Sequence, residues 1–97
     1  MNPAGAGTDP RGSRHSRVPG RTWREISIST SFEIRNLLLW VGGAPDRGLE
    51  GNQEIWRVRL GKAVFTGYGT GTVYCNGGNE PNLAFLYQKI GDLTLGA

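Results

Sequence analysis

Apolar and polar residues alternate along four stretches of the chain, a pattern typical of half-buried β-strands. The first stretch is Trp23–Ser29, in which Ile26 and Ile28 share one face. The other three cover residues 53–60, 63–68 and 72–76. Their apolar faces carry Trp56, Val58, Leu60, Ala63, Phe65, Val73 and Cys75. Glycine-containing turns at residues 61–62 and 69–71 are expected to join these three strands into hairpins.

Two further stretches have the helical period. The first begins at Thr30-Ser31-Phe32-Glu33, which has the form of a capping box, and ends at Gly42-Gly43. The second follows Asn79 and Pro81 and ends at Gly91. Their apolar stripes are Ile34, Leu37, Leu38 and Val41, and Leu83, Leu86, Tyr87 and Ile90. The order β-α-β-β-β-α predicts an α+β fold, a four-stranded antiparallel sheet with two helices on one face.

The basic excess of the chain lies in its first 21 residues. The net charge is +3, and residues 1–21 hold four arginines against one aspartate, whereas residues 22–97 hold seven cations and seven anions. Residues 1–21 have too few apolar side chains to offset their ordering entropy. We therefore predict a disordered basic tail over 1–21 and a single α+β domain over 22–97. The tail is interpreted either as an arm that touches phosphate or as an unstructured leader.

Residues that support catalysis or metal binding are scarce. His15 is the only histidine and lies in the predicted tail, and Cys75 is the only cysteine and lies on the apolar face of a strand. Gly67–Gly71 is similar to a phosphate-binding loop, but a strand follows it where such a loop needs a helix. We expect no enzymatic activity, no metal and no cofactor. With one cysteine and no apolar run long enough for a membrane span, we expect a cytoplasmic protein that is not inserted in a membrane.

The sheet face opposite the helices is predicted to be polar, with tyrosines, threonines and cations and no segment left to cover it. Cations contact phosphate and aromatic rings stack on bases, so this composition favours nucleic-acid binding. The alternative is an ordinary solvated face, because threonine, tyrosine and arginine occur often in strands. Ser27 and Ser29 are expected on the same face. The candidate binding residues are Arg57, Arg59, Lys62, Thr66, Tyr68, Thr72, Tyr74 and Asn76.

Residues 56–77 resemble one repeat of the TATA-box-binding protein. W-R-V-R at 56–59 is similar to an M-R-I-R strand of that family, and Y-G-T-G-T-V-Y-C-N-G at 68–77 is similar to its F-S-S-G-K-M-V-C-T-G hairpin. The N-terminal domain of type III bacterial ribonuclease H uses the same half-saddle architecture. The resemblance implies that Arg57 contacts phosphate and that Tyr68 wedges into a base step. It also implies that Thr66, Tyr74 and Asn76 line a minor groove.

The chain also departs from that family. The position of the family's second wedging phenylalanine is Gly51 here, and the chain holds one repeat where the family's saddle has two. The predicted function is therefore a small nucleic-acid-binding module that uses its open sheet face. The alternatives are an assembly subunit that docks a protein through the sheet face or edge, and an RNA-particle protein that contacts RNA through the basic tail.

A homodimer is also expected. Trp23–Ser29 would form an edge strand that contains no proline, lysine or bulge to block pairing with another chain. Two copies could join at this edge and rebuild a continuous saddle. Trp23 would then lie near the two-fold axis, against its symmetry mate.

Overall fold

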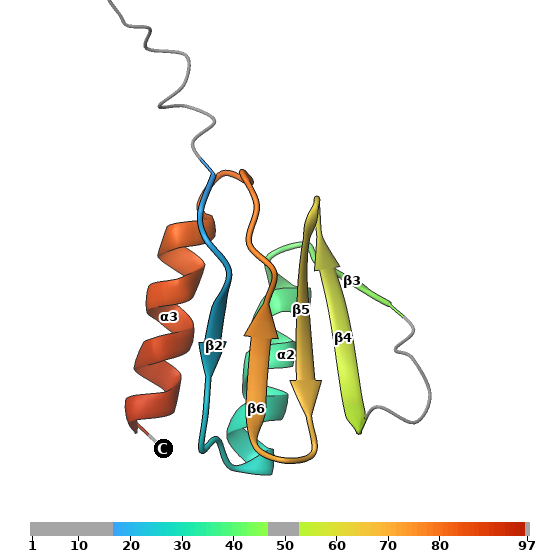
Figure 1. The fold of residues 1–97 in the computed structure, drawn as a ribbon, viewed down its shortest axis with the longest axis vertical. Helices are drawn as coiled ribbons and strands as arrows, with labels where there is room; N and C mark the ends of the chain where they lie inside the picture. The colour runs from blue at the N-terminus through green and yellow to red at the C-terminus, as the bar shows by residue number, and fades with distance from the viewer. Residues whose placement is uncertain (1–16, 47–52, 97) are drawn as a thin grey trace, which may run out of the picture.

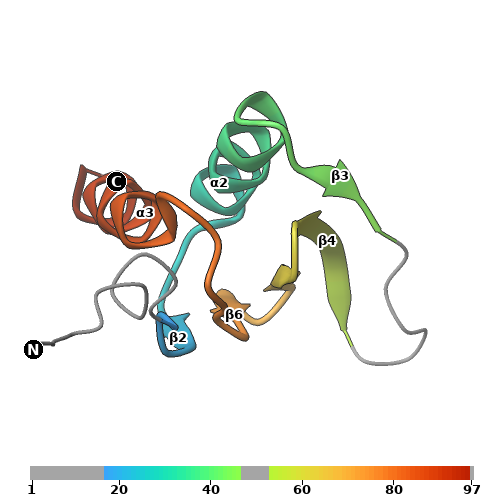
Figure 2. The same ribbon diagram turned by 90° about the horizontal axis from the view of Figure 1, so that it is seen from above.

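The computed structural model describes residues 17–46 and 53–96 as one layer of strands covered by two helices. The elements are β2 (Arg21–Trp23), α2 (Ile28–Trp40), β3 (Ala44–Pro45), β4 (Glu54–Leu60), β5 (Ala63–Tyr68), β6 (Thr72–Cys75) and α3 (Leu83–Gly96). The strands pair antiparallel in the order β2-β6-β5-β4-β3. Both helices lie on the same face of the sheet (Figure 1; Figure 2). The predicted α+β class is confirmed. The sheet has a fifth short strand, β3, in addition to the four strands that the sequence predicted.

The first strand is shorter and begins earlier than predicted. Only Arg21–Trp23 pairs with β6, with Trp23 opposite Val73. Glu25 then takes a positive φ of 57°, which turns the chain out of the sheet. Ile26 remains buried in the connecting segment, whereas Ile28 is exposed on the first turn of α2. The prediction that the strand runs on to Ser29 is therefore wrong, and so is the placement of Ser27 and Ser29 on the sheet face.

Helix α2 begins before the predicted capping box. Ser27 is its N-cap, and the Ser27 Oγ accepts a hydrogen bond of 3.2 Å from the backbone N–H of Thr30. Thr30 and Ser31 are consequently buried within the helix. Ser and Thr cap helices about equally well, and the segment offers both within four positions, so the sequence admits either start. The predicted end is confirmed, since α2 stops at Trp40 and Gly42 has a φ of 107°.

Helix α3 is longer than predicted. Its stripe of Leu83, Leu86, Tyr87 and Ile90 is buried as expected. Gly91, however, lies inside the helix, which continues to Gly96. The prediction that Gly91 ends the helix is wrong, because a helix interior tolerates a glycine at a modest cost when the surrounding residues favour it.

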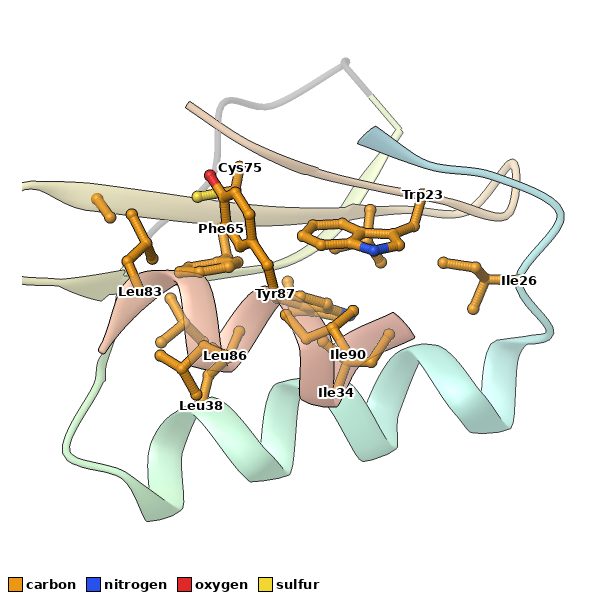
Figure 3. Packing of buried hydrophobic residues seen from close by; sticks show 14 residues of the cluster. Trp23, Ile26, Ile34, Leu38, Phe65, Cys75, Leu83, Leu86, Tyr87 and Ile90 are labelled. Atoms are coloured by element: carbon orange, nitrogen blue, oxygen red, sulfur yellow. The ribbon is translucent and has the colours of Figure 1, made fainter. Parts of the chain in front are cut away.

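The core lies between the helices and the inner face of the sheet (Figure 3). Phe65 is fully buried, and the ring of Tyr87 meets it edge-on with the ring centroids 6.4 Å apart. The ring of Trp23 meets Tyr87 in the same way at 5.3 Å. Trp23 is only 6% exposed and faces this core. Little of its surface is therefore left to contact a symmetry mate, and the strand edge is confined to β2 because residues 24–29 leave the sheet. The homodimer itself stays a prediction.

The domain begins several residues before the predicted boundary at residue 22. Val18 and Gly78 exchange two backbone hydrogen bonds of 2.6 and 3.0 Å. The Tyr87 hydroxyl donates to the carbonyl oxygen of Pro19 at 2.8 Å. Residues 17–21 are thus held on β6 and α3 rather than forming part of a disordered tail. Residues 1–16 of the predicted tail, with His15, lie outside the described residues, as does Gly51.

Neither helix of the described ranges has the length and apolar character that a membrane crossing requires.

Candidate nucleic-acid interface

The outer face, defined here as the sheet face opposite α2 and α3, is built from rows of residues that lie opposite each other on neighbouring strands. Such residues point to the same side of a sheet. One row runs across β4, β5, β6 and β2 and consists of Arg57, Thr66, Tyr74 and Thr22. Six predicted binding residues thereby share this face, namely Arg57, Arg59, Thr66, Tyr68, Thr72 and Tyr74. Neither helix covers the outer face (Figure 2).

The two tyrosines of the outer face differ in accessibility. Tyr74 lies in the middle of the row and is 41% exposed. Tyr68 is half-buried at the end of β5, between Glu54 on β4 and Thr72 on β6. Thr66, between Arg57 and Tyr74, is buried. Tyr74 is therefore the better placed ring for stacking on a base, although the family resemblance assigns the wedging position to Tyr68.

Arg57 is neutralised by a neighbour on its own strand. Its guanidinium donates a hydrogen bond to the Glu54 carboxylate at 2.7 Å. The two side chains are only 22% and 6% exposed, so water screens this pair weakly. The Nε atom of Arg57 is buried and has no hydrogen-bond partner within the described residues. Arg57 thus presents little free positive charge to a phosphate.

Arg59 is more accessible but also has an acidic neighbour. Its guanidinium lies 2.8 Å from a carboxylate oxygen of Asp46, and its side chain is 58% exposed. Asp46 is fixed in place because its backbone N–H donates to the Arg57 carbonyl oxygen at 2.8 Å. An exposed pair of this kind is worth little energy and can exchange partners. Arg59 can therefore turn towards a phosphate at small cost.

Lys62 and Asn76 lie at the end of the sheet rather than within the rows. Lys62 occupies the turn between β4 and β5, where its backbone N–H donates to the Glu80 carboxylate at 2.8 Å. Its side chain is exposed and makes no ion pair within the described ranges. The Asn76 side-chain oxygen accepts from the Val64 N–H at 3.0 Å and so extends the pairing of β5 with β6. That oxygen is occupied by the fold, which weakens the expectation that Asn76 reads a base edge.

Sequence reasoning missed several residues of the face. Thr22 was not predicted on the outer face because the strand was expected to begin at Trp23. The role of Glu54 escaped because residues three apart on a regular strand point to opposite faces. The register shift between Glu54 and Trp56 is a bulge that brings Glu54 and Arg57 to the same side. A bulge leaves no mark in a hydrophobic pattern, so the ion pair could not be seen in advance.

The described residues offer binding groups but no grouping for metal chemistry. No cluster of three histidine, cysteine or acidic side chains occurs among them. Cys75 lies on the opposite side of the sheet in the core, where burial raises the pKa of its thiol. What the outer face can supply is a stacking ring, hydroxyl groups, an exposed guanidinium and, at its end, an ammonium group.

The sequence matches no protein-family model and no curated protein. Among solved structures, the chain is similar to RNase H3 of Aquifex aeolicus, with a TM-score of 0.60 and 19% sequence identity. The similarity covers 76% of this chain and 26% of that protein, so the chain spans about a quarter of its length. At this identity the likeness shows a shared fold. The expected relationship in fold to a type III ribonuclease H is confirmed, and the resemblance to a TATA-box-binding-protein repeat stays a prediction.

Proposed function

We propose that the chain is a non-enzymatic module that binds nucleic acid on its outer face. The observation that carries the proposal is the row Arg57, Thr66, Tyr74 and Thr22, a line of polar residues on the sheet face that neither helix covers, in which the ring of Tyr74 is exposed (Figure 2). Sheet faces of this composition bind nucleic acids by stacking bases on aromatic rings while cations contact the backbone.

Each group has a distinct task in this proposal. Tyr74 stacks on a base, and the hydroxyl groups of Thr22 and Thr72 supply hydrogen bonds at either side of it. Arg59 leaves Asp46 to contact a phosphate, and Lys62 contacts a second phosphate from the turn. Arg57 keeps its ion pair with Glu54 and holds the face in shape.

Two likenesses support this use of the face. The protein that shares the fold is by name a ribonuclease, and residues 56–77 resemble a repeat of a family that binds DNA through the same sheet face. Because the chain corresponds to about a quarter of RNase H3, the nuclease activity of the whole protein is not carried over. The shared part is proposed to hold a nucleic acid, not to cut it.

Fluorescence anisotropy with labelled single-stranded DNA, duplex DNA and RNA at several salt concentrations tests the proposal. Tyr74→Ala is expected to weaken binding about five- to hundredfold, the usual loss of 1–3 kcal/mol for one stacked base, with little change in salt dependence. Arg59→Ala is expected to weaken binding and reduce the salt slope by about 0.7–0.9. Arg35→Ala is the matched control, since it removes the same charge from α2 on the helical side.

Absence of binding to all three probes at low salt would refute the proposal. Equal losses for Arg59→Ala and Arg35→Ala would show that overall charge, and not the outer face, is responsible. A variant that lacks residues 1–16 but keeps the outer face separates this proposal from RNA contact through the predicted tail. Loss of binding in that variant would favour the RNA-particle alternative.

A second candidate, an assembly subunit that docks a protein, is favoured by a different part of the surface. Trp40, Val41 and Phe85 expose large apolar side chains at one end of the helical layer. These side chains play no part in the outer face, and exposed aromatic residues that are grouped together commonly mark protein interfaces.

A further inference from the structure

The end of α2, the end of β4 and the start of α3 lie at the same end of the domain (Figure 1). Residues at these places line an open apolar groove on the helical side of the sheet. Its volume is about 490 Å³. Apolar side chains from all three elements line it, with a carboxylate and an amide at one side. The lining residues used below are Val41, Leu60, Phe85, Leu86, Glu80 and Asn82.

A protruding side chain precedes the groove residue Val41 in the sequence. Trp40 is the last residue of α2, immediately before Val41 of the groove wall, and it is 85% exposed. The other two tryptophans, Trp23 and Trp56, are buried in the core. Burial of the large apolar surface of the Trp40 indole would be favourable, and this free energy is not gained while the ring stays in water.

We propose that a second copy of the chain covers this patch, with Trp40 of each copy inserted into the groove of the other. An interface with two-fold symmetry uses the same patch on both copies, so the patch must hold both a projection and a matching recess. Trp40 and the groove meet that requirement. The groove is large enough for an indole ring, because an apolar cavity of about 150 Å³ holds benzene.

The groove also suits the polar edge of the ring. A buried indole N–H normally finds a hydrogen-bond acceptor. The Glu80 carboxylate is held at the groove by the backbone N–H of Lys62, at 2.8 Å, and the Asn82 amide lies in the same wall. Charge does not oppose the pairing, because residues 22–97 carry equal numbers of cations and anions. Tryptophan is also among the side chains that contribute most to protein interfaces.

The proposed dimer uses the side of the sheet opposite the outer face, and the two surfaces approach each other at the turn that holds Lys62. Leu60 points to the inner face of the sheet with Trp56 and Val58, so the groove opens on the side opposite the outer face. It also differs from pairing at the edge of β2, which does not involve α2.

Sedimentation velocity on the full chain, from low micromolar to several hundred micromolar, tests the proposal. One copy has a mass of 10.5 kDa, and the expected result is a species of twice that mass that forms with increasing concentration. Trp40→Glu removes the inserted ring from both copies and is expected to weaken dimerisation about a thousandfold, the loss of two interface hot spots of about 2 kcal/mol each. Leu95→Glu is the control: it replaces a side chain that is 88% exposed near the opposite end of α3 and should leave the dimer intact.

Tryptophan fluorescence gives a second readout. Because Trp23 and Trp56 are buried, the emission of a solvated indole comes from Trp40, and it should shift to shorter wavelength as the dimer forms. A monomer at the highest concentration would overturn the proposal. So would a dimer that Trp40→Glu weakens no more than Leu95→Glu, which would place the contact on another surface such as the β2 edge.

Discussion

The indole ring of Trp56 occupies the space in which a side chain on Gly67 would stand. The two residues lie directly opposite each other on β4 and β5. The atoms nearest to a Cβ built on Gly67 are Cε2, Nε1 and Cζ2 of that ring. The same ring donates a hydrogen bond of 2.9 Å from Nε1 to the Ser31 hydroxyl on α2. Gly67 therefore serves the packing of helix on sheet, not a turn or a phosphate loop.

Gly67→Ala should lower the free energy of unfolding by about 1–3 kcal/mol, since overpacking forces the ring and the strands to shift. Urea denaturation followed by circular dichroism measures the change.

Gly91→Ala is the control for this substitution. Gly91 lies inside α3, and a Cβ built on it has no atom within 4 Å other than those of its chain neighbours and the adjacent helix backbone; its φ is not positive. Alanine there should raise the free energy of unfolding by about 0.5–1 kcal/mol, the usual gain for glycine to alanine in a helix interior. If Gly67→Ala proved neutral, the packing of Trp56 against Gly67 would be wrong.

A second prediction concerns the start of α2. Ser27→Ala removes the side chain that accepts the Thr30 N–H and should cost about 1 kcal/mol of stability. Glu33→Ala, which removes the side-chain acceptor that a capping box needs, should change stability little, because Glu33 is exposed and is not the capping partner of this helix. Thermal or urea unfolding of the two variants distinguishes the observed cap from the capping box suggested by the sequence. The opposite ranking would restore a helix start at Thr30.

The third prediction is a loss of stability at alkaline pH. Burial raises the pKa of Cys75 above its ordinary value of 9.0, while the neighbouring Tyr87 hydroxyl and the hydrogen bond from the Gly77 N–H lower this pKa in part. Burial also raises the pKa of Tyr87 above its ordinary value of 10.0, and the neighbouring Cys75 raises it further. The two side chains lie together in the core (Figure 3).

Both groups bind their protons more tightly in the folded than in the unfolded chain. Their contribution is therefore complete below about pH 9 and is lost as the pH rises through 9 and 10 towards the folded-state pKa values. Urea unfolding at a series of pH values should show this decline. Cys75→Ala should make the decline start at higher pH, because only Tyr87 then remains to titrate. An unchanged profile in Cys75→Ala would exclude the thiol as a cause.

The sequence predicted best those strands in which the alternation of apolar and polar residues fits only a β-strand. Val58, Phe65 and Val73 alternate over long runs between glycine turns, and all are fully buried on the inner face. The first strand failed for the converse reason. Ile26 and Ile28 alternate like strand residues, yet the same spacing fits a turn followed by the start of a helix, and packing of Ile26 against the sheet decides between them.

The sequence predicted which residues of β4, β5 and β6 share the outer face, but not the acidic neighbours of the two arginines. The alternation of residues 57–74 was enough to place Arg57, Thr66 and Tyr74 on one face. The acidic neighbours of the two arginines depend on a bulge at Glu54 and on the two-residue strand β3, which brings Asp46 beside Arg59. Neither feature has a periodic signal in the sequence, because each involves too few residues to repeat.

The ion pairs lead to a prediction that separates the two arginines. Arg57→Ala should weaken nucleic-acid binding less than Arg59→Ala, because Glu54 already neutralises Arg57 whereas the Arg59 side chain is largely exposed. Glu54→Gln removes the neutralising charge and should strengthen binding, with a steeper dependence on salt. Glu33→Gln is the control, since it makes the same change of charge on the helical side. Circular dichroism first establishes that each variant is folded, and anisotropy titrations then give the affinities.

Equal gains for Glu54→Gln and Glu33→Gln would mean that net charge alone sets the affinity. A complete loss of binding in folded Arg57→Ala would show that Arg57 leaves Glu54 to contact the phosphate itself.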